Sequence, residues 1–134
     1  MNRDKLKDLY DKYNLTKEDV FKHQHYIIIT RTGIEKIEAQ EKIQVTYKSI
    51  KAEPNFAVVQ AFGELNGKNM ETFGSAYKGA TFKEGNTNTW YVSEMAEKRA
   101  FSRIVLKLTG FYALGVFGED ESEDFKQKIN IVKE

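Results

Sequence analysis

The chain has 134 residues, of which 40% are hydrophobic, and its nine Phe, seven Tyr and one Trp are enough for one packed domain. It has no cysteine, which excludes disulfides and thiolate metal sites, and its net charge of +1 does not by itself indicate a nucleic-acid partner. The first residues are charged, and no apolar run approaches the ~20 residues of a membrane span. We therefore expect a cytoplasmic protein with no membrane partner.

The first part of the chain is predicted to form short helices around one strand. Asp4–Tyr13 has apolar residues at helical spacing, and Thr16–Asp19 is typical of a capping start for one more helical turn. Tyr26–Thr30 is a β-branched run, which predicts a strand. Thr32, with Glu35 three residues later, is predicted to cap a further helix.

The next part has the pattern of an antiparallel meander. Ile43–Lys51 alternates between apolar and polar residues, and Phe56–Leu65 and Asn69–Tyr77 are predicted as the second and third strands. Pro54-Asn55 is typical of a turn. Asn66-Gly67 is the strongest short hairpin signal, because both residues tolerate the positive φ that a two-residue turn requires.

The meander is followed by a polar loop and a long helix. The loop, Gly79–Asn88, is rich in Gly, Asn and Thr, whereas Trp90–Gly110 has no proline and no internal glycine. The fold class is therefore α+β: an antiparallel meander of three to four strands is covered by a long C-terminal helix, with short N-terminal helices. We expect one domain over residues 1–118 and an acidic tail with a short helix over residues 119–134.

Charge is unevenly distributed along the chain. Five acids lie close together near the C-terminus: Glu119, Asp120, Glu121, Glu123 and Asp124. Without these five charges the net charge rises from +1 to +6. A basic body with an acidic segment is one pattern of nucleic-acid binders, but on the charge pattern alone we favour a solvated acidic loop beside an ordinary surface.

On a helical wheel, the long helix carries two apolar stripes on nearly opposite sides. The first consists of Phe101, Ile104, Val105 and Leu108. The second consists of Val92, Met95, Ala96 and Leu106. Arg99 and Arg103 lie one turn apart within the second stripe, whereas a one-sided surface helix would place its arginines opposite the apolar face.

Three interpretations of these arginines remain open on physical grounds. Arg99 and Arg103 pair with acids such as Glu94 or Glu97 and lay their stems along the sheet. Alternatively, their stripe forms a subunit interface, where arginine is enriched. In the third interpretation, both guanidinium groups project towards phosphates.

The stretch Trp90–Arg103, W-Y-V-S-E-M-A-E-K-R-A-F-S-R, resembles the E-M-A-E-x-R-A-x-x-R-A type of helix in phage single-strand annealing proteins of the Erf and Sak kind. These proteins are similar in fold to the eukaryotic annealing recombinase. Upstream, Leu15–Phe21, Tyr26–Thr30 and Thr32–Ile37 resemble the opening of that type of domain. The resemblance covers most of Leu15–Asp124 and includes the order of meander, polar loop and helix.

The resemblance implies a protein that binds single-stranded DNA, assembles as rings or filaments, and anneals complementary strands during phage-type DNA recombination and repair. It implies no enzymatic activity, no cofactor and no catalytic metal, and a location in the bacterial host cytoplasm. DNA would run along a positive groove between the hairpin region and the helix. A recombination exonuclease or a single-strand-binding protein is the expected protein partner. The alternative is an interaction module, such as a recombination accessory factor or an inhibitor of a host complex, without DNA binding of its own.

A single-strand binder needs cations for the backbone and flat side chains for the bases. The candidate cations are Arg31, Lys48, Lys51, Lys78, Lys83, Lys98, Arg99 and Arg103. The candidate flat side chains are Tyr47, Tyr77, Phe82, Trp90 and Tyr91, and we favour Trp90 and Tyr91 because they lie where the loop joins the helix. Each aromatic is alternatively a core residue. His23 and His25 have no third fixed ligand, so we expect no metal site.

Overall fold

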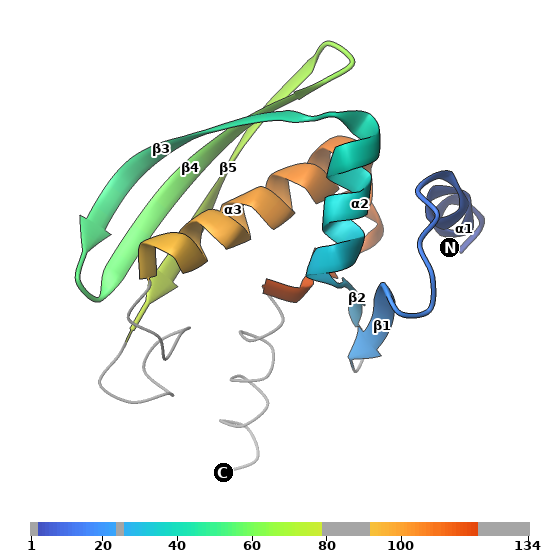
Figure 1. Cartoon of the computed structure of the whole chain (residues 1–134), viewed down its shortest axis with the longest axis horizontal. Helices are drawn as coiled ribbons and strands as arrows, with labels where there is room; N and C mark the ends of the chain where they lie inside the picture. The colour runs from blue at the N-terminus through green and yellow to red at the C-terminus, as the bar shows by residue number, and fades with distance from the viewer. Residues whose placement is uncertain (1–2, 24–25, 79–91, 121–134) are drawn as a thin grey trace.

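The computed structural model describes residues 3–23, 26–78 and 92–120. Its elements, in chain order, are α1 (Arg3–Lys12), β1 (Val20–His23), β2 (Tyr26–Ile29), α2 (Arg31–Glu41), β3 (Gln44–Glu53), β4 (Phe56–Leu65), β5 (Lys68–Tyr77), α3 (Val92–Thr109), the 3₁₀ turn η1 (Tyr112–Leu114) and β6 (Val116–Gly118). Strands β3, β4 and β5 form an antiparallel sheet with α3 along one face (Figure 1). This arrangement confirms the predicted α+β class and the meander covered by a long helix.

Helix α3 approaches the sheet closely because the strands carry small residues where it crosses them. A Cβ at Gly74 of β5 would meet the backbone of α3 at Ala96 and Ala100, and one at Gly63 of β4 would meet the side chains of Ile104 and Leu108. The inward residues of β4, among them Ala57, Val59 and Ala61, are buried because α3 lies against this side of the sheet. Small side chains therefore let one helix cover the sheet at short range.

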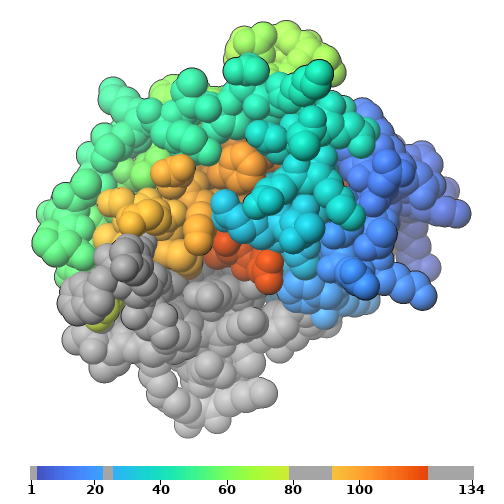
Figure 2. Space-filling model, in the orientation of Figure 1, coloured from blue at the N-terminus to red at the C-terminus, as the bar shows by residue number. Residues whose placement is uncertain are grey.

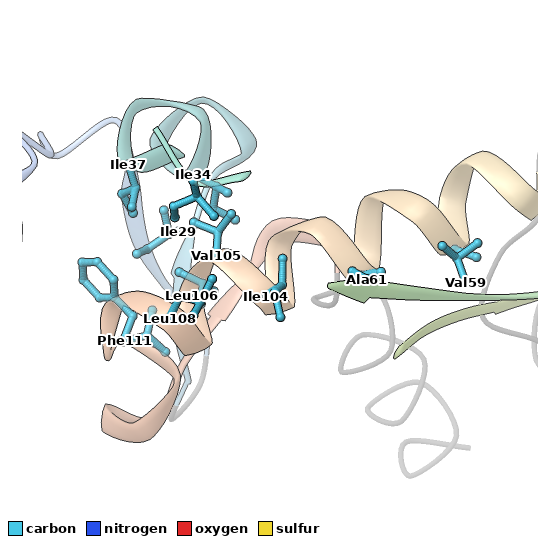
Figure 3. Close-up of a cluster of buried hydrophobic side chains, with 14 of the residues drawn as sticks. Ile29, Ile34, Ile37, Val59, Ala61, Ile104, Val105, Leu106, Leu108 and Phe111 are labelled. Carbon is cyan, nitrogen blue, oxygen red and sulfur yellow. The ribbon is translucent and has the colours of Figure 1, made fainter. Parts of the chain in front are cut away.

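The other side of α3 is also covered, so the helix is buried on two sides. It packs against α2 and β6 as well as against β4 and β5. Figure 3 shows Val59 and Ala61 beside one part of the helix and the side chains of Ile34 and Ile37, from α2, near Val105. The two layers do not correspond to the two predicted stripes, because Ile104 and Leu108 of the first stripe and Ala96 of the second all face the sheet, whereas Val105 of the first stripe lies near α2.

A second, smaller sheet was not predicted from the sequence. It has the order β1-β2-β6, with β1 antiparallel and β6 parallel to β2. The predicted capping start at Thr16–Asp19 is confirmed, but the segment forms a single hydrogen-bonded turn rather than a helical one and leads into β1. The Thr16 backbone N–H donates to the Asp19 carboxylate at 2.9 Å, and the Thr30 N–H donates to the Asp19 carbonyl at 2.8 Å.

The N-cap of helix α2 lies two residues before its predicted position. Thr30 is the N-cap: its backbone is extended, and its hydroxyl accepts a hydrogen bond from the Gly33 N–H at 3.1 Å. Thr32, the predicted cap, lies inside the helix. The mistake arises because strand β2 runs directly into the helix and Thr30 serves both elements.

The turn signals in the sequence are confirmed. Asn66 and Gly67 have φ values of 52° and 79°, as the two-residue hairpin requires, and Leu65 pairs with Lys68. Pro54-Asn55 joins β3 to β4. Gly110 has a φ of 90° directly after α3, which is the geometry of a glycine helix stop.

The first two acids of the predicted tail are bound to the domain. The backbone N–H of Arg31, at the start of α2, donates to Glu119 Oε1 at 3.0 Å, and the Ser102 hydroxyl donates to Asp120 Oδ2 at 2.8 Å. The remaining acids, Glu121, Glu123 and Asp124, lie outside the described residues, as does the predicted loop Gly79–Asn88.

Candidate nucleic-acid interface

Arg99 and Arg103 lie along the free edge of strand β5. Arg99 Nη1 donates to the Ser75 carbonyl at 3.0 Å, and Arg103 Nη1 donates to the Phe73 carbonyl at 3.0 Å. Counting from the two-residue turn, Phe73 and Ser75 are positions whose carbonyls point away from β4. The one-turn spacing of the arginines on α3 thus matches the two-residue spacing of outward carbonyls on an edge strand. The arginines cap that edge.

Arg99 has a structural role in this arrangement. Its side chain is buried, with only 2% of the residue exposed, and its Nε also donates to the Asp120 carbonyl at 3.1 Å. A strand of DNA on the surface cannot reach this guanidinium unless the edge of the sheet opens. Of the three interpretations, the one in which the arginine stems lie along the sheet describes Arg99. Arg103 is only partly buried, and contact between Arg103 and DNA stays a prediction.

Arg31 and Lys98 come together in a groove of about 440 Å³ between α2, β3 and α3. Arg31 is already engaged, because its Nε lies 3.1 Å from Glu35 Oε1 and its Nη1 lies 3.6 Å from Asp120 Oδ2. The groove lining contains Glu35, Glu38 and Glu97 against these two cations. The described lining therefore does not provide the positive path that the family resemblance implies.

Lys48 and Lys51 lie on the face of the β3–β5 sheet opposite α3, which none of the helices in the described ranges covers and which we call the outer face. Residues that pair across strands share a face, so the register defines its rows. Two adjacent central rows hold the lysines: Lys48–Gln60–Phe73 and Lys51–Val58–Ser75. The flanking rows are Thr46–Phe62–Glu71 and Glu53–Phe56–Tyr77.

Aromatic rings stand exposed on both sides of these lysines. Phe62 is 36% exposed, Phe73 46% and Tyr77 40%. The rings of Phe56 and Tyr77 meet edge to face, with centroids 6.1 Å apart. The outer face thus places a ring pair at one end, Phe62 nearer the hairpin, and the two lysine rows between them, with Phe73 in the same row as Lys48.

On the outer face, the positive charges lie near the centre and the negative charges lie towards the two ends. Lys51 Nζ lies 3.6 Å from Glu53 Oε1 and 5.8 Å from the centroid of the Phe56 ring. Lys48 has no ion-pair partner among the residues that the structure describes. Glu53 lies at one end of the face, and Glu64 and Glu71 lie towards the hairpin, so the centre of the face is its positive part.

The remaining predicted residues are not on the outer face or lie outside the described chain. Lys78 directly follows β5, and its backbone N–H donates to the Asn55 carbonyl at 2.7 Å. Tyr47 lies in the groove rather than on the outer face. Lys83, Phe82, Trp90 and Tyr91 lie outside the described residues.

Sequence reasoning missed Phe62 and Phe73 as candidate functional residues. The signal is the alternation along β4 and β5, in which the inward positions are small and the outward positions are large. Ala57, Ala61, Gly74 and Ala76 point inwards, opposite to the exposed rings. In such an alternating pattern the large rings would ordinarily be assigned to the core side. Here the small residues mark the side that the helix covers, and the rings lie on the other side.

Comparisons of the chain with protein-family models, curated proteins and solved structures find no match. None of the helices in the described ranges is long and apolar enough to cross a membrane. The candidate site is therefore defined by the geometry of the outer face.

Proposed function

We propose that this protein binds single-stranded DNA on the outer face of the β3–β5 sheet and promotes annealing of complementary strands. The observation that carries the proposal is the pair of lysines, Lys48 and Lys51, in the rows between exposed aromatic rings. The annealing activity rests on the resemblance of the α3 sequence to phage annealing proteins. Assembly into a ring or filament, a bacterial cytoplasmic location, and a recombination exonuclease or single-strand-binding protein as partner belong to the same proposal.

The outer face suits unpaired bases for a physical reason. Stacking of a base on an exposed aromatic ring contributes about 1–3 kcal/mol, and every base has a face that can stack. In a duplex these base faces are covered by neighbouring base pairs, so they do not reach a flat sheet. Lysines between the rings supply contacts to phosphates, which makes the binding salt-dependent.

The distribution of charge indicates where the strand lies. The carboxylates of Glu64 and Glu71 would repel phosphates near the hairpin, and Glu53 neutralises part of the charge of Lys51 at the other end. The favourable path therefore crosses the central rows, over Phe73 and beside Lys48. Contacts of this kind hold the backbone without reading sequence, as annealing of arbitrary strands requires.

The proposal is tested by fluorescence anisotropy at low salt with labelled oligo-dT and with a duplex of the same length. We expect a preference for the single strand, and about a tenfold or greater loss of affinity in Phe73→Ala/Tyr77→Ala, since two stacking contacts are removed. Phe21→Ala is the matched control, because Phe21 is also exposed, at 38%, but belongs to β1. The absence of any preference for single strands at micromolar protein would refute the proposal, as would an equal loss in the control.

A second candidate function is protein binding by the same face. Phe62, Phe73 and Tyr77 are large and exposed on this face, and exposed apolar side chains gathered on one face also mark protein interfaces. A pull-down from cell extract with and without nuclease distinguishes the two functions. Partners that survive nuclease and are lost in Phe73→Ala/Tyr77→Ala favour the interaction module.

A further inference from the structure

The groove between α2, β3 and α3 has the opposite chemistry to the outer face. Figure 2 shows atoms of α3 at the bottom of a hollow bounded by β3 and α2. The side chains that line it come from all three elements, and they include Glu38 of α2, Tyr47 of β3 and Glu97 of α3. A ligand in the groove would therefore contact three parts of the fold at once.

The charges in the groove are only partly compensated. The guanidinium of Arg31 is held between Glu35 and Asp120, at 3.1 and 3.6 Å. Glu38 and Glu97, from facing helices, have no ion-pair partner within the described ranges. Lys98 is the neighbouring cation in the lining, and it is exposed to solvent. The groove thus offers two uncompensated carboxylates to a ligand.

An aromatic ring lies beside these carboxylates. Tyr47 is 40% exposed although it points to the covered side of the sheet. Burial, together with the negative charges of Glu97 and Glu38, raises the pKa of Tyr47 to about 12, and the charge of Arg31 opposes this shift. The ring and both carboxylates line the same groove.

We propose that this groove binds an arginine side chain from a basic segment of a partner protein. The guanidinium would stack on the ring of Tyr47 and donate hydrogen bonds to Glu38 and Glu97. Arginine fits better than lysine because a planar guanidinium both stacks on a ring and donates two parallel hydrogen bonds to a carboxylate. This site does not depend on DNA binding, because its charge repels phosphate.

The test titrates a hexaarginine peptide, acetylated and amidated at its ends, into the full-length protein by isothermal calorimetry. Glu38→Gln/Glu97→Gln removes the two negative charges of the groove. Glu121→Gln/Glu123→Gln removes two negative charges from the acidic segment and is the matched control for overall charge. We expect the groove variant to bind the peptide about tenfold more weakly and the control to change by less than about threefold.

The ring contact has its own pair of variants. Tyr47→Phe keeps the ring and should bind hexaarginine within about twofold of the wild type, whereas Tyr47→Ala should lose about two- to fivefold, the range of an exposed cation–π contact. Circular dichroism checks that each variant is folded. Equal weakening in the groove variant and the charge control would overturn the site, and so would no binding of hexaarginine by the wild type.

Discussion

Replacing Arg99 by alanine should cost a large part of the stability of the domain without a specific effect on DNA binding. The guanidinium makes hydrogen bonds to two carbonyls, of Ser75 and Asp120, and each such bond from a charged donor contributes about 1.5–3 kcal/mol. With both bonds removed from a residue that is 2% exposed, we expect Arg99→Ala to lower the free energy of unfolding by about 3–5 kcal/mol. Domains of this kind have about 5–15 kcal/mol in total.

Arg103→Ala provides the internal comparison. Arg103 caps the next outward carbonyl along the same edge, that of Phe73, but it is only partly buried. Losing a hydrogen bond at a partly solvated position costs about 1 kcal/mol. The ratio between the two variants therefore reports the combined contribution of burial and of the additional hydrogen bond from Arg99 to Asp120. Lys98→Ala is the control, because Lys98 adjoins Arg99 on the helix but is exposed.

Urea denaturation followed by circular dichroism measures these differences. With a slope of about 1.5 kcal/mol per molar urea, a loss of about 4 kcal/mol moves the midpoint by between about 2 and 3 M. The reasoning fails if Arg99→Ala remains within about 1 kcal/mol of the wild type, or if it lowers DNA affinity while its stability is unchanged. Either result would mean that the guanidinium is available to a ligand rather than committed to the edge of β5.

Three further outcomes follow from the structure. Gly74→Ala places a methyl group against the backbone of α3 and should destabilise the domain by about 2–4 kcal/mol in urea, whereas near-neutrality would contradict the close approach. Lys48→Ala should reduce the salt slope of single-strand binding by about one without changing stability, and an unchanged slope would place the phosphates elsewhere. Although burial opposes it, hydrogen bonding and charge from Lys36 lower the pKa of Asp19, so its contribution to stability is present above about pH 4 and is lost as the pH falls through the lowered value. Asp19→Asn should therefore flatten the acid limb of stability, and an unchanged acid limb in thermal scans would refute that assignment.

Local patterns in the sequence predicted the parts of the fold that local chemistry determines. The Asn66-Gly67 hairpin, the stop at Gly110 and the long strands each depend on residues a few positions apart. Strands β1 and β6 have only four and three residues, which is too short for a period, and β6 pairs with a strand almost ninety residues earlier. Such pairing depends on the packing of α3 and α2, so it cannot be predicted from residues that are close together in the sequence.

The sequence predicted some residues of the candidate site but not the face or edge on which they lie, because those also depend on long-range packing. Alternation predicts that Lys48 lies on the face opposite Tyr47, but it would place Lys51, three residues later, on the other face, and only the register irregularity between Ser49 and Lys51 brings both lysines to one face. Alternation also shows only that two faces differ. Which face is covered depends on how close α3 can come, and the glycines at positions 63 and 74 decide that. Similarly, the wheel showed that Arg99 lies among apolar residues, but only the order of strands identified the edge that it caps.

Both edges of the β3–β5 sheet are protected against strand pairing, which limits how copies of this protein can associate. Arg99 and Arg103 occupy outward carbonyls of β5. On the other edge, β3 carries exposed Lys48 and Lys51 and a register irregularity between Ser49 and Lys51, and lysines and bulges are devices that prevent edge pairing. Continuation of the sheet from one copy to the next would require the arginines to leave β5. The proposed ring or filament would therefore not be built by continuing the β3–β5 sheet from copy to copy, and the outer face can serve either a neighbour or a DNA strand at any one place, but not both.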